Sequence, residues 1–285
     1  MLSIIISSYQ PHYYNQLVKN IAETIGDGFS YEIIQIWNPN LMSITKAYND
    51  GAEKAQFDYL LFLHEDVLFH TQNWGEKLIS HFNSPEVGII GVSGSNYVPI
   101  APSSWTVSDE YHFINILETD DKGTTHTKST KHNKNKVFGV DGVFQAVKKN
   151  IFETYKYNFD LEGFHGYDLD FSLRVSNTQQ NYTVDNILIE HFSRGNLTKL
   201  WLDANIKIRE NIKFNKIKNR PSEIERKAFL SFIYKYFEYY PINIKNFFFT
   251  FSFYPYNLKL KDHIIILKKY YSYLRYSSTL NKKNK

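Results

Sequence analysis

The sequence of 285 residues contains no cysteine. This absence excludes disulfide bonds and thiolate chemistry, so a bound metal would need carboxylate or imidazole ligands. No run of about 18 uninterrupted apolar residues occurs, and we expect no membrane-spanning helix. The chain begins with an apolar run that lacks a basic segment before it and a small-residue cleavage site after it, so we also expect no signal peptide. These features fit a reducing compartment and a cytoplasmic location.

Charge is distributed unevenly along the chain. Residues 207–285 contain 18 Lys and Arg but 5 Asp and Glu, whereas residues 1–206 contain 15 and 24. An acidic body therefore carries a basic tail, which is also rich in aromatic residues. Such asymmetry predicts an anionic partner for the tail, either membrane lipid or nucleic acid. No nucleic-acid recognition module is visible in the sequence, which favours lipid.

Apolar runs alternate with amphipathic segments in the first part of the chain. The pattern predicts three buried strands separated by two helices, in the order residues 2–6, 11–25, 31–37, 43–55 and 59–63. Pro11 is well placed to start the first helix, and Ser43 can cap the second. A β-α-β-α-β order at this spacing is typical of a parallel sheet with right-handed crossovers.

Further elements are predicted downstream. We expect a helix, a strand, one or two strands, a helix and a strand at residues 73–82, 87–94, 137–149, 164–175 and 182–189. Residues 95–136 lack periodicity, and we expect a mobile loop or a small excursion near the functional site. From residue 197 onward the pattern is helical. This tail is interpreted either as a subdomain packed on the body or as a surface that docks on a membrane.

Polar residues follow two of the predicted strands. The third strand ends in His64, Glu65 and Asp66, and the last ends in Glu190 and His191. In open α/β sheets, ligands bind beyond the carboxyl ends of the strands. The first cluster therefore suits a metal-holding carboxylate, although an ordinary acidic turn explains it equally well.

Several short motifs follow one another in a set order. They are a strand ending in a small polar turn and a tyrosine, a helix with an Asn-Asp-Gly pattern, an acidic strand end, a Gly-containing strand, an acidic pair followed by arginine, and a late histidine. The motifs are Ile6-Ser7-Ser8-Tyr9, Ala47-Tyr48-Asn49-Asp50-Gly51, His64-Glu65-Asp66, Val140-Asp141-Gly142, Gly166-Tyr167-Asp168-Leu169-Asp170 with Arg174, and Glu190-His191. In this order and at this spacing, about residues 1–200 resemble the family 2 nucleotide-sugar glycosyltransferases of the GT-A fold.

The resemblance implies a fold and a division of the chain. The fold class would be α/β, GT-A (Rossmann-like), with a mixed, mostly parallel sheet flanked by helices and a C-terminal helical extension. Residues 1–205 would form the GT-A catalytic domain, and residues 206–285 the basic, aromatic-rich helical extension. Two positions depart from the family pattern. His64 replaces the first acid of Asp-x-Asp, and the second strand ends in Trp37-Asn38 instead of the acids that contact the base.

The resemblance also implies site residues. Asp66 and His191 would hold Mn²⁺ or Mg²⁺ at the donor diphosphate, and Asp168 would be the general base of a single, inverting displacement. The helix start beside Asp168 would lower its pKa and keep it charged. Tyr167 and Asp170 would bind the acceptor. The donor would be bound by Ser7, Tyr9, Trp37, Asn38, Asn49, His64, Glu65, Asp141 and Gly142.

Most of these roles have a structural alternative. Asp66 and Asp168 would alternatively be acids at helix starts, and His191 a histidine of the core or of a turn, although the resemblance favours the functional role for each. Tyr9 and Trp37 would either stack on the uracil face or belong to the core.

The predicted activity is metal-assisted transfer of a sugar from a UDP-sugar to a glycan acceptor hydroxyl, in surface polysaccharide or lipooligosaccharide synthesis of the bacterial type. A lipid-linked acceptor would explain the basic tail and place the protein at the inner face of the cytoplasmic membrane. Two rival functions stay open. A nucleotidyltransferase would need a Gly-rich basic phosphate loop, which residues 6–10 lack. A catalytically degenerate module that binds a glycan or a partner is the other rival.

Overall fold

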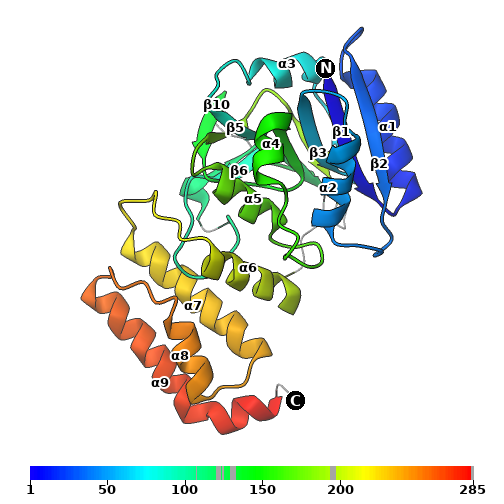
Figure 1. The fold of residues 1–285 in the computed structure, drawn as a ribbon. Helices are drawn as coiled ribbons and strands as arrows, with labels where there is room; N and C mark the ends of the chain where they lie inside the picture. Colours follow the sequence, from blue (N-terminus) through cyan, green and yellow to red (C-terminus); the bar gives the residue numbers. More distant parts are fainter. Residues whose placement is uncertain (107, 120–122, 124, 129–132, 193–196, 284–285) are drawn as a thin grey trace. The chain divides into compact units, whose positions relative to one another are not determined.

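The computed structural model describes residues 1–283 apart from 107, 120–122, 124, 129–132 and 193–196. The chain forms two compact units, Met1–Tyr97 with Glu110–Asn196 and Val98–Asp109 with Leu197–Lys285 (Figure 1). The predicted division after residue 205 falls inside helix α6 (Lys199–Asn211) of the second unit. On this helix, the Arg209 guanidinium donates hydrogen bonds to the carbonyls of Pro99 and Ser103, which ties their segment to the second unit.

A seven-stranded sheet forms the centre of the first unit, in the order β10-β13-β5-β12-β3-β1-β2. Its strands are β1 (Leu2–Ser8), β2 (Tyr31–Trp37), β3 (Tyr59–His64), β5 (Val87–Gly91), β10 (Lys134–Val137), β12 (Phe144–Lys148) and β13 (Gln180–Val184). Strand β1 is parallel to β2 and β3, whereas β12 is antiparallel to both β3 and β5. The sheet is therefore mixed and mostly parallel, which confirms the predicted α/β fold class.

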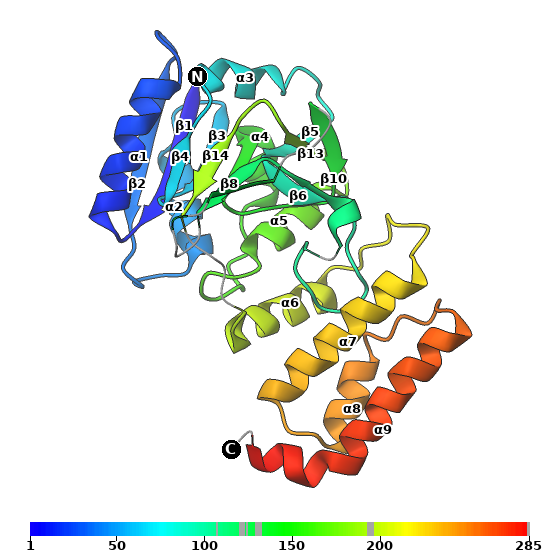
Figure 2. The same cartoon turned by 180° about the vertical axis from the view of Figure 1, so that it is seen from behind.

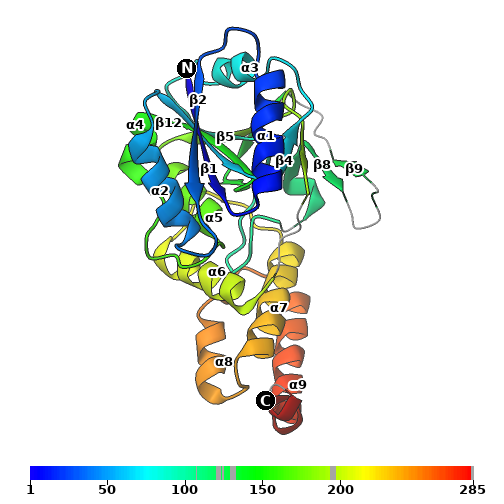
Figure 3. The ribbon, with the colours of Figure 1, turned by 90° about the vertical axis from the view of Figure 1, so that its right-hand side faces the viewer.

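Helices cover both faces of this sheet. Helices α1 (Pro11–Thr24) and α3 (Trp74–Ser80) share a hydrophobic core with Ile4 of β1 on one face. Helices α2 (Ile44–Lys54), α4 (Lys149–Tyr155) and α5 (Tyr167–Val175) share a second core with Ile5 on the other face. Successive residues of β1 thus point to opposite faces and are buried on both, as expected of a central strand. Figure 3 shows α1 on one side of the sheet and α2 and α4 on the other.

Two smaller sheets include three short strands, β7 (His112–Ile114), β8 (Ile116–Thr119) and β9 (Thr125–Lys128), from the stretch for which the sequence predicted a loop. One sheet contains β4 (Val67–Phe69), β14 (Ile189–His191), β8 and β9. The other contains β11 (Gly139–Val140), β6 (Ser93–Ser95) and β7. A 3-10 turn at Asp109–Tyr111 precedes β7. Figure 2 shows β4, β14 and β8 side by side. Residues 96–106 and 108 contain no helix or strand, in agreement with the prediction of a loop or excursion, whereas this prediction was wrong for β7, β8, β9 and the start of β10. Residues 107, 120–122, 124 and 129–132 of this stretch lie outside the described part.

Two predicted strands also divide. Strand 87–94 becomes β5 and β6, and strand 182–189 becomes β13 and β14, with each half in a different sheet. Helix α4 was not predicted at all. Strands of three or four residues show too few alternations to be recognised, and they form because neighbouring strands pair with them.

The second unit is helical, as predicted. Its described helices are α6, α7 (Ser222–Tyr239), α8 (Ile244–Phe251) and α9 (Leu260–Lys283). Aromatic side chains dominate its core, among them Phe229, Phe232 and Tyr270. Within the described residues, none of the helices combines the length and the apolar content needed to cross a bilayer.

Candidate functional site

Three side chains with metal-ligating atoms meet beyond the carboxyl end of β3. His191 Nε2 lies 3.5 Å from Asp66 Oδ1, and His64 Nδ1 lies 4.0 Å from the same oxygen. The three ligand atoms all lie within 4.8 Å of one another. Two imidazoles and a carboxylate suit Mn²⁺ and related divalent metals. The residues therefore fit a metal site, and His64, which was predicted to contact the donor, is a third candidate ligand.

Strand pairing explains why His191 lies beside Asp66. Strand β14 runs antiparallel to β4, so that His191 pairs with Val67, the residue after Asp66. The backbone amide of Phe192 donates to the carbonyl of Asp66 at 3.1 Å. The candidate metal site thus depends on the pairing of two segments that are far apart in the sequence.

Burial and neighbouring charges act differently on the two histidines. Burial is the largest effect on His64 and lowers its pKa, although the charge of Asp66 opposes this shift. Burial also acts to lower the pKa of His191. There, the hydrogen bond and charge of Asp66, helped by Asp141 and Glu118, outweigh burial and raise the pKa overall. A neutral imidazole is the form that binds a metal, so the lowered pKa of His64 favours ligation.

Tyr167 determines how His64 is oriented. The Tyr167 hydroxyl is hydrogen-bonded to His64 Nε2 at 2.8 Å, while Nδ1 of the same ring faces Asp66. Gly142 permits this contact, because a Cβ at that position would lie 2.2 Å from the Tyr167 hydroxyl oxygen. Tyr167 was predicted to bind the acceptor, and the structure places its side chain in the buried core with its hydroxyl directed at His64. Metal-binding imidazoles are commonly held by a hydrogen bond to the second ring nitrogen.

Replacement of Tyr167 by phenylalanine is expected to weaken metal binding. The ring would still fill its place in the core, but His64 would lose the hydrogen bond that orients it, and Mn²⁺ affinity should fall about tenfold. Titration calorimetry with Mn²⁺ measures this. Tyr155→Phe is the matched control, because it removes a hydroxyl that bonds Thr178 on the surface. Equal Mn²⁺ affinities for Tyr167→Phe and the wild type would remove the proposed orienting role.

Asp168 lies in the first turn of α5. The helix begins after Gly166, whose φ of 75° lies in the left-handed region that glycine adopts without strain. Burial, and then the charge of Asp141, raise the pKa of Asp168 to about 7, although backbone amides act to lower it. The prediction of a lowered pKa was therefore wrong. It counted the stabilising amides at the helix start and missed the cost of removing a carboxylate from water.

The raised pKa predicts that Asp168 makes stability depend on pH. Its folded pKa lies above the unfolded value of about 3.9, so the folded state favours the protonated form, and this stabilisation is lost as the pH rises through about 7. In urea unfolding, Asp168→Asn should be more stable than the wild type by about 2 kcal/mol at pH 8, after allowance for partial exposure. This advantage should shrink at pH 5. A difference that is the same at both pH values would contradict the raised pKa.

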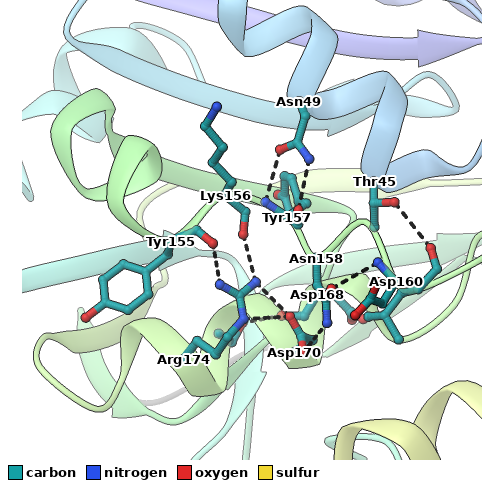
Figure 4. Close-up of polar contacts among 12 residues, drawn as sticks. Thr45, Asn49, Tyr155, Lys156, Tyr157, Asn158, Asp160, Asp168, Asp170 and Arg174 are labelled. Atoms are coloured by element: carbon teal, nitrogen blue, oxygen red, sulfur yellow. Dashed lines mark hydrogen bonds and ion pairs between the residues drawn. The ribbon is translucent and has the colours of Figure 1, made fainter. Parts of the chain in front are cut away.

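Asp170 is buried and forms an ion pair with Arg174, whose side chain is partly exposed. Arg174 contacts Asp170 Oδ2 through Nε at 2.8 Å and through Nη2 at 2.7 Å. The same guanidinium donates to the carbonyls of Tyr155 and Lys156 (Figure 4). The Asp-x-x-x-Arg part of the motif therefore joins α5 to the end of α4. The acceptor contact predicted for Asp170 stays a prediction, and its carboxylate already has partners within the chain.

Three residues predicted to bind the donor hold the surrounding backbone. Both carboxylate oxygens of Glu65 accept hydrogen bonds from the amides of Tyr9 and Gln10, at 3.1 to 3.2 Å. These amides precede α1 and have no partner within that helix. The carboxamides of Asn38 and Asn49 each donate to and accept from backbone groups, and Figure 4 shows the pair of bonds at Asn49. These side chains shape the loops from which other groups project.

Tyr9 and Trp37 lie at the ends of two adjacent strands. Trp37 pairs in register with Ser8, the residue before Tyr9. Tyr9 is 56% exposed and Trp37 is 48% exposed. The alternative that both belong to the core was therefore wrong, and both rings are available to a ligand. Ser7 lies one residue earlier, where its hydroxyl accepts a hydrogen bond from the carboxamide of Asn38.

Comparison with known proteins concerns both sequence and fold. Residues 3–229 match the profile of a family described as a glycosyltransferase like family, whereas no curated protein matches the sequence. S. aureus TarS 1-349, solved in complex with UDP-GlcNAc, is 10% identical with a TM-score of 0.56, over 99% of this chain and 88% of that one. GalNAc-T7, solved with UDP, GalNAc and Mn²⁺, is 12% identical with a TM-score of 0.52, over 82% of this chain. The match covers 54% of the GalNAc-T7 chain, so this protein spans about half of it.

At such low identity the two structures are informative about the fold, and both have the mixed sheet flanked by helices of the GT-A glycosyltransferases. The family profile covers well over half of the chain, including every residue of the candidate metal site and Asp168. The protein belongs to this glycosyltransferase family and has the GT-A fold.

Proposed function

We propose that the protein transfers a sugar from a UDP-sugar to a hydroxyl group of a glycan acceptor, with inversion at the anomeric carbon. The observation that carries this proposal is that His64, Asp66 and His191 meet at the end of β3, with Asp168 nearby. Gly142 lies close to both parts of the site. A Cβ at Gly142 would meet the Asp168 side chain and the Tyr167 hydroxyl, which is hydrogen-bonded to His64. The solved relatives bind UDP-GlcNAc or UDP with Mn²⁺, which supports the same donor class here.

The candidate metal site would stabilise the diphosphate that leaves the donor. Negative charge grows on the leaving oxygen as the sugar departs, and a divalent cation bound by Asp66, His191 and His64 would neutralise it. We assign Mn²⁺ or Mg²⁺ to this role. Two imidazoles in the ligand set favour Mn²⁺, since Mg²⁺ prefers oxygen ligands.

Asp168 is assigned as the general base. With a pKa of about 7, its carboxylate can take the proton of the acceptor hydroxyl at neutral pH and is basic enough to do so efficiently. Removal of this proton lets the acceptor oxygen attack the anomeric carbon in a single displacement, which inverts the configuration. The negative charge of Asp141 keeps the pKa of Asp168 high and so contributes to its basicity.

The donor base is assigned to the exposed aromatic pair. Tyr9 and Trp37 offer ring faces at neighbouring strand ends, where uracil can stack. Ser7 and Asp141 lie at strand ends of the same unit and would contact the ribose, the phosphates or the sugar. Synthesis of a surface polysaccharide or lipooligosaccharide is the biological setting that the family resemblance implies.

UDP binding tests the proposal. Thermal unfolding of the full chain is expected to shift upward by about 5 °C with UDP and Mn²⁺ at a hundredfold excess over Kd, and less with UDP alone. UDP release from a panel of UDP-sugars then identifies the donor. An absent shift under both conditions would favour the degenerate binding module. A metal-dependent shift together with release of pyrophosphate from UTP, only when a sugar phosphate is present, would instead favour the nucleotidyltransferase.

A further inference from the structure

An apolar stripe runs along the exposed side of α9. Leu260, Ile264, Leu267, Tyr271 and Leu274 follow one another at alternating spacings of four and three residues, which places them on one side of the helix. Each of these residues has between 44% and 76% of its surface exposed. Single exposed apolar residues are ordinary, but five in a line indicate an interaction surface.

A different face of α9 holds the helix in its unit. Ile266, Tyr270 and Tyr273 are buried in the aromatic core of the second unit. Asp262 is also buried, and one of its carboxylate oxygens lies 2.7 Å from Nε of Arg226 on α7. His263, Leu280 and Asn281 add further contacts to the same unit, and the residues of the apolar stripe are not among these contacts.

Basic residues border the stripe. Lys261, Lys268 and Arg275 recur every seven residues and form a row beside the stripe, on its side away from the buried face. Residues 241–285 contain nine Lys and Arg and a single acid, Asp262. Because that acid is buried and paired, the exposed side of α9 combines apolar side chains with positive charge.

The charge pattern distinguishes between two partners for the stripe. Two copies of α9 packed antiparallel would bring the basic row against itself, and the repulsion would oppose association. In a parallel pair, the basic row would meet the other flank of the stripe, where His263 and Ser277 offer no acid. A bilayer with anionic lipids satisfies both features, since apolar side chains enter the interface while Lys and Arg remain at the headgroups.

We propose that α9 lies in the plane of an anionic membrane, with the stripe inserted at the headgroup boundary, and thereby docks the protein on that membrane. The stripe is about 21 Å long and covers only one side of the helix, which suits a helix lying on the bilayer. Tyr271 near its middle presents an apolar ring and a polar hydroxyl, a combination favoured at this boundary. Docking does not depend on the proposed sugar transfer, so either can fail alone.

Vesicle flotation of the full chain tests the docking surface. The wild type is expected to float with phosphatidylcholine vesicles that contain about one third phosphatidylglycerol, and to float far less with pure phosphatidylcholine. Leu260→Gln/Leu267→Gln/Leu274→Gln should reduce the bound fraction at least about tenfold, because it removes most of the inserted apolar area. Lys261→Gln/Lys268→Gln/Arg275→Gln should also reduce it at least about tenfold. All substituted side chains point outward, so circular dichroism should show unchanged helix content.

Two matched controls distinguish the effect of the α9 surface from the effects of net charge and of exposed leucines in general. Lys19→Gln/Lys54→Gln/Lys156→Gln changes the net charge by the same amount at exposed positions of the first unit. Leu41→Gln/Leu197→Gln/Leu200→Gln removes three exposed leucines outside α9. Both controls should float like the wild type. Equal loss in a control and in its α9 counterpart, or equal wild-type binding to neutral and anionic vesicles, would overturn the proposal. The wild type could instead fail to float and form a dimer in light scattering. If the α9 leucine variant were then a monomer, the stripe would mediate self-association and not membrane docking.

Discussion

Replacement of Asp168 by asparagine is expected to reduce sugar transfer about a thousandfold while UDP and Mn²⁺ binding stay unchanged. The carboxamide occupies the same space but cannot accept the acceptor proton, and loss of a positioned general base costs about 10² to 10⁴ in rate. The effect should appear in kcat with KM for the donor nearly unaffected, since the base acts on the acceptor. The measurement is UDP release under saturating donor and acceptor, with UDP affinity followed in parallel by thermal shift.

A matched control for this variant lies at the opposite end of the sheet. Asp58 is exposed and precedes β3, so Asp58→Asn makes the same chemical change away from the strand ends that form the site. It should retain wild-type turnover. If Asp168→Asn also retains turnover, Asp168 is not the base. If it loses both turnover and UDP binding, the residue supports the structure of the donor site instead.

Replacement of Asp66 by asparagine is expected to abolish the effect of metal on UDP binding and to lower transfer by about a thousandfold or more. Asp66 Oδ1 is the oxygen shared by both histidines, and it supplies the negative charge of the ligand group. Residues that merely support a metal ligand cost 10- to 100-fold in affinity when removed, so loss of a direct ligand should cost more than about a hundredfold. Titration calorimetry with Mn²⁺, in the presence of UDP, measures this loss.

Two outcomes for Asp66→Asn would contradict its role as a metal ligand. Unchanged Mn²⁺ affinity would mean that the three side chains form a structural cluster and do not bind the metal. Lost transfer with normal Mn²⁺ and UDP affinities would assign Asp66 a role in the reaction other than metal binding. Asp58→Asn again provides the control, because it leaves the metal-ligating atoms in place.

The strands and helices of the first part of the chain could be predicted from the sequence. Strand β2 matches its predicted range, and Ser43 caps α2 by accepting a hydrogen bond from the amide of Lys46. These features depend on local rules, namely burial on both faces of a strand and satisfaction of amides at a helix start. Short strands such as β7 and β8 escaped prediction because their stability comes from their neighbours.

The site could be predicted only in part. Asp66 and His191 were expected to lie together because the family resemblance pairs them, whereas periodicity alone gives no distance between them. His64 was recognised as a departure from the family pattern, but its position as a third metal-ligating side chain depends on its contact with Tyr167. The left-handed backbone at Gly166 and the close approach of Tyr167 to Gly142 likewise depend on the three-dimensional structure.

The sequence by itself determined the α/β architecture, the helical basic tail and the set of polar residues at strand ends, because burial periodicity and charge distribution are local properties of the chain. The tertiary structure alone decided which of those residues meet, through the pairing of β14 with β4. It also decided the ionisation of Asp168, since desolvation and the charge of Asp141 act through space and reverse the effect expected from the helix start.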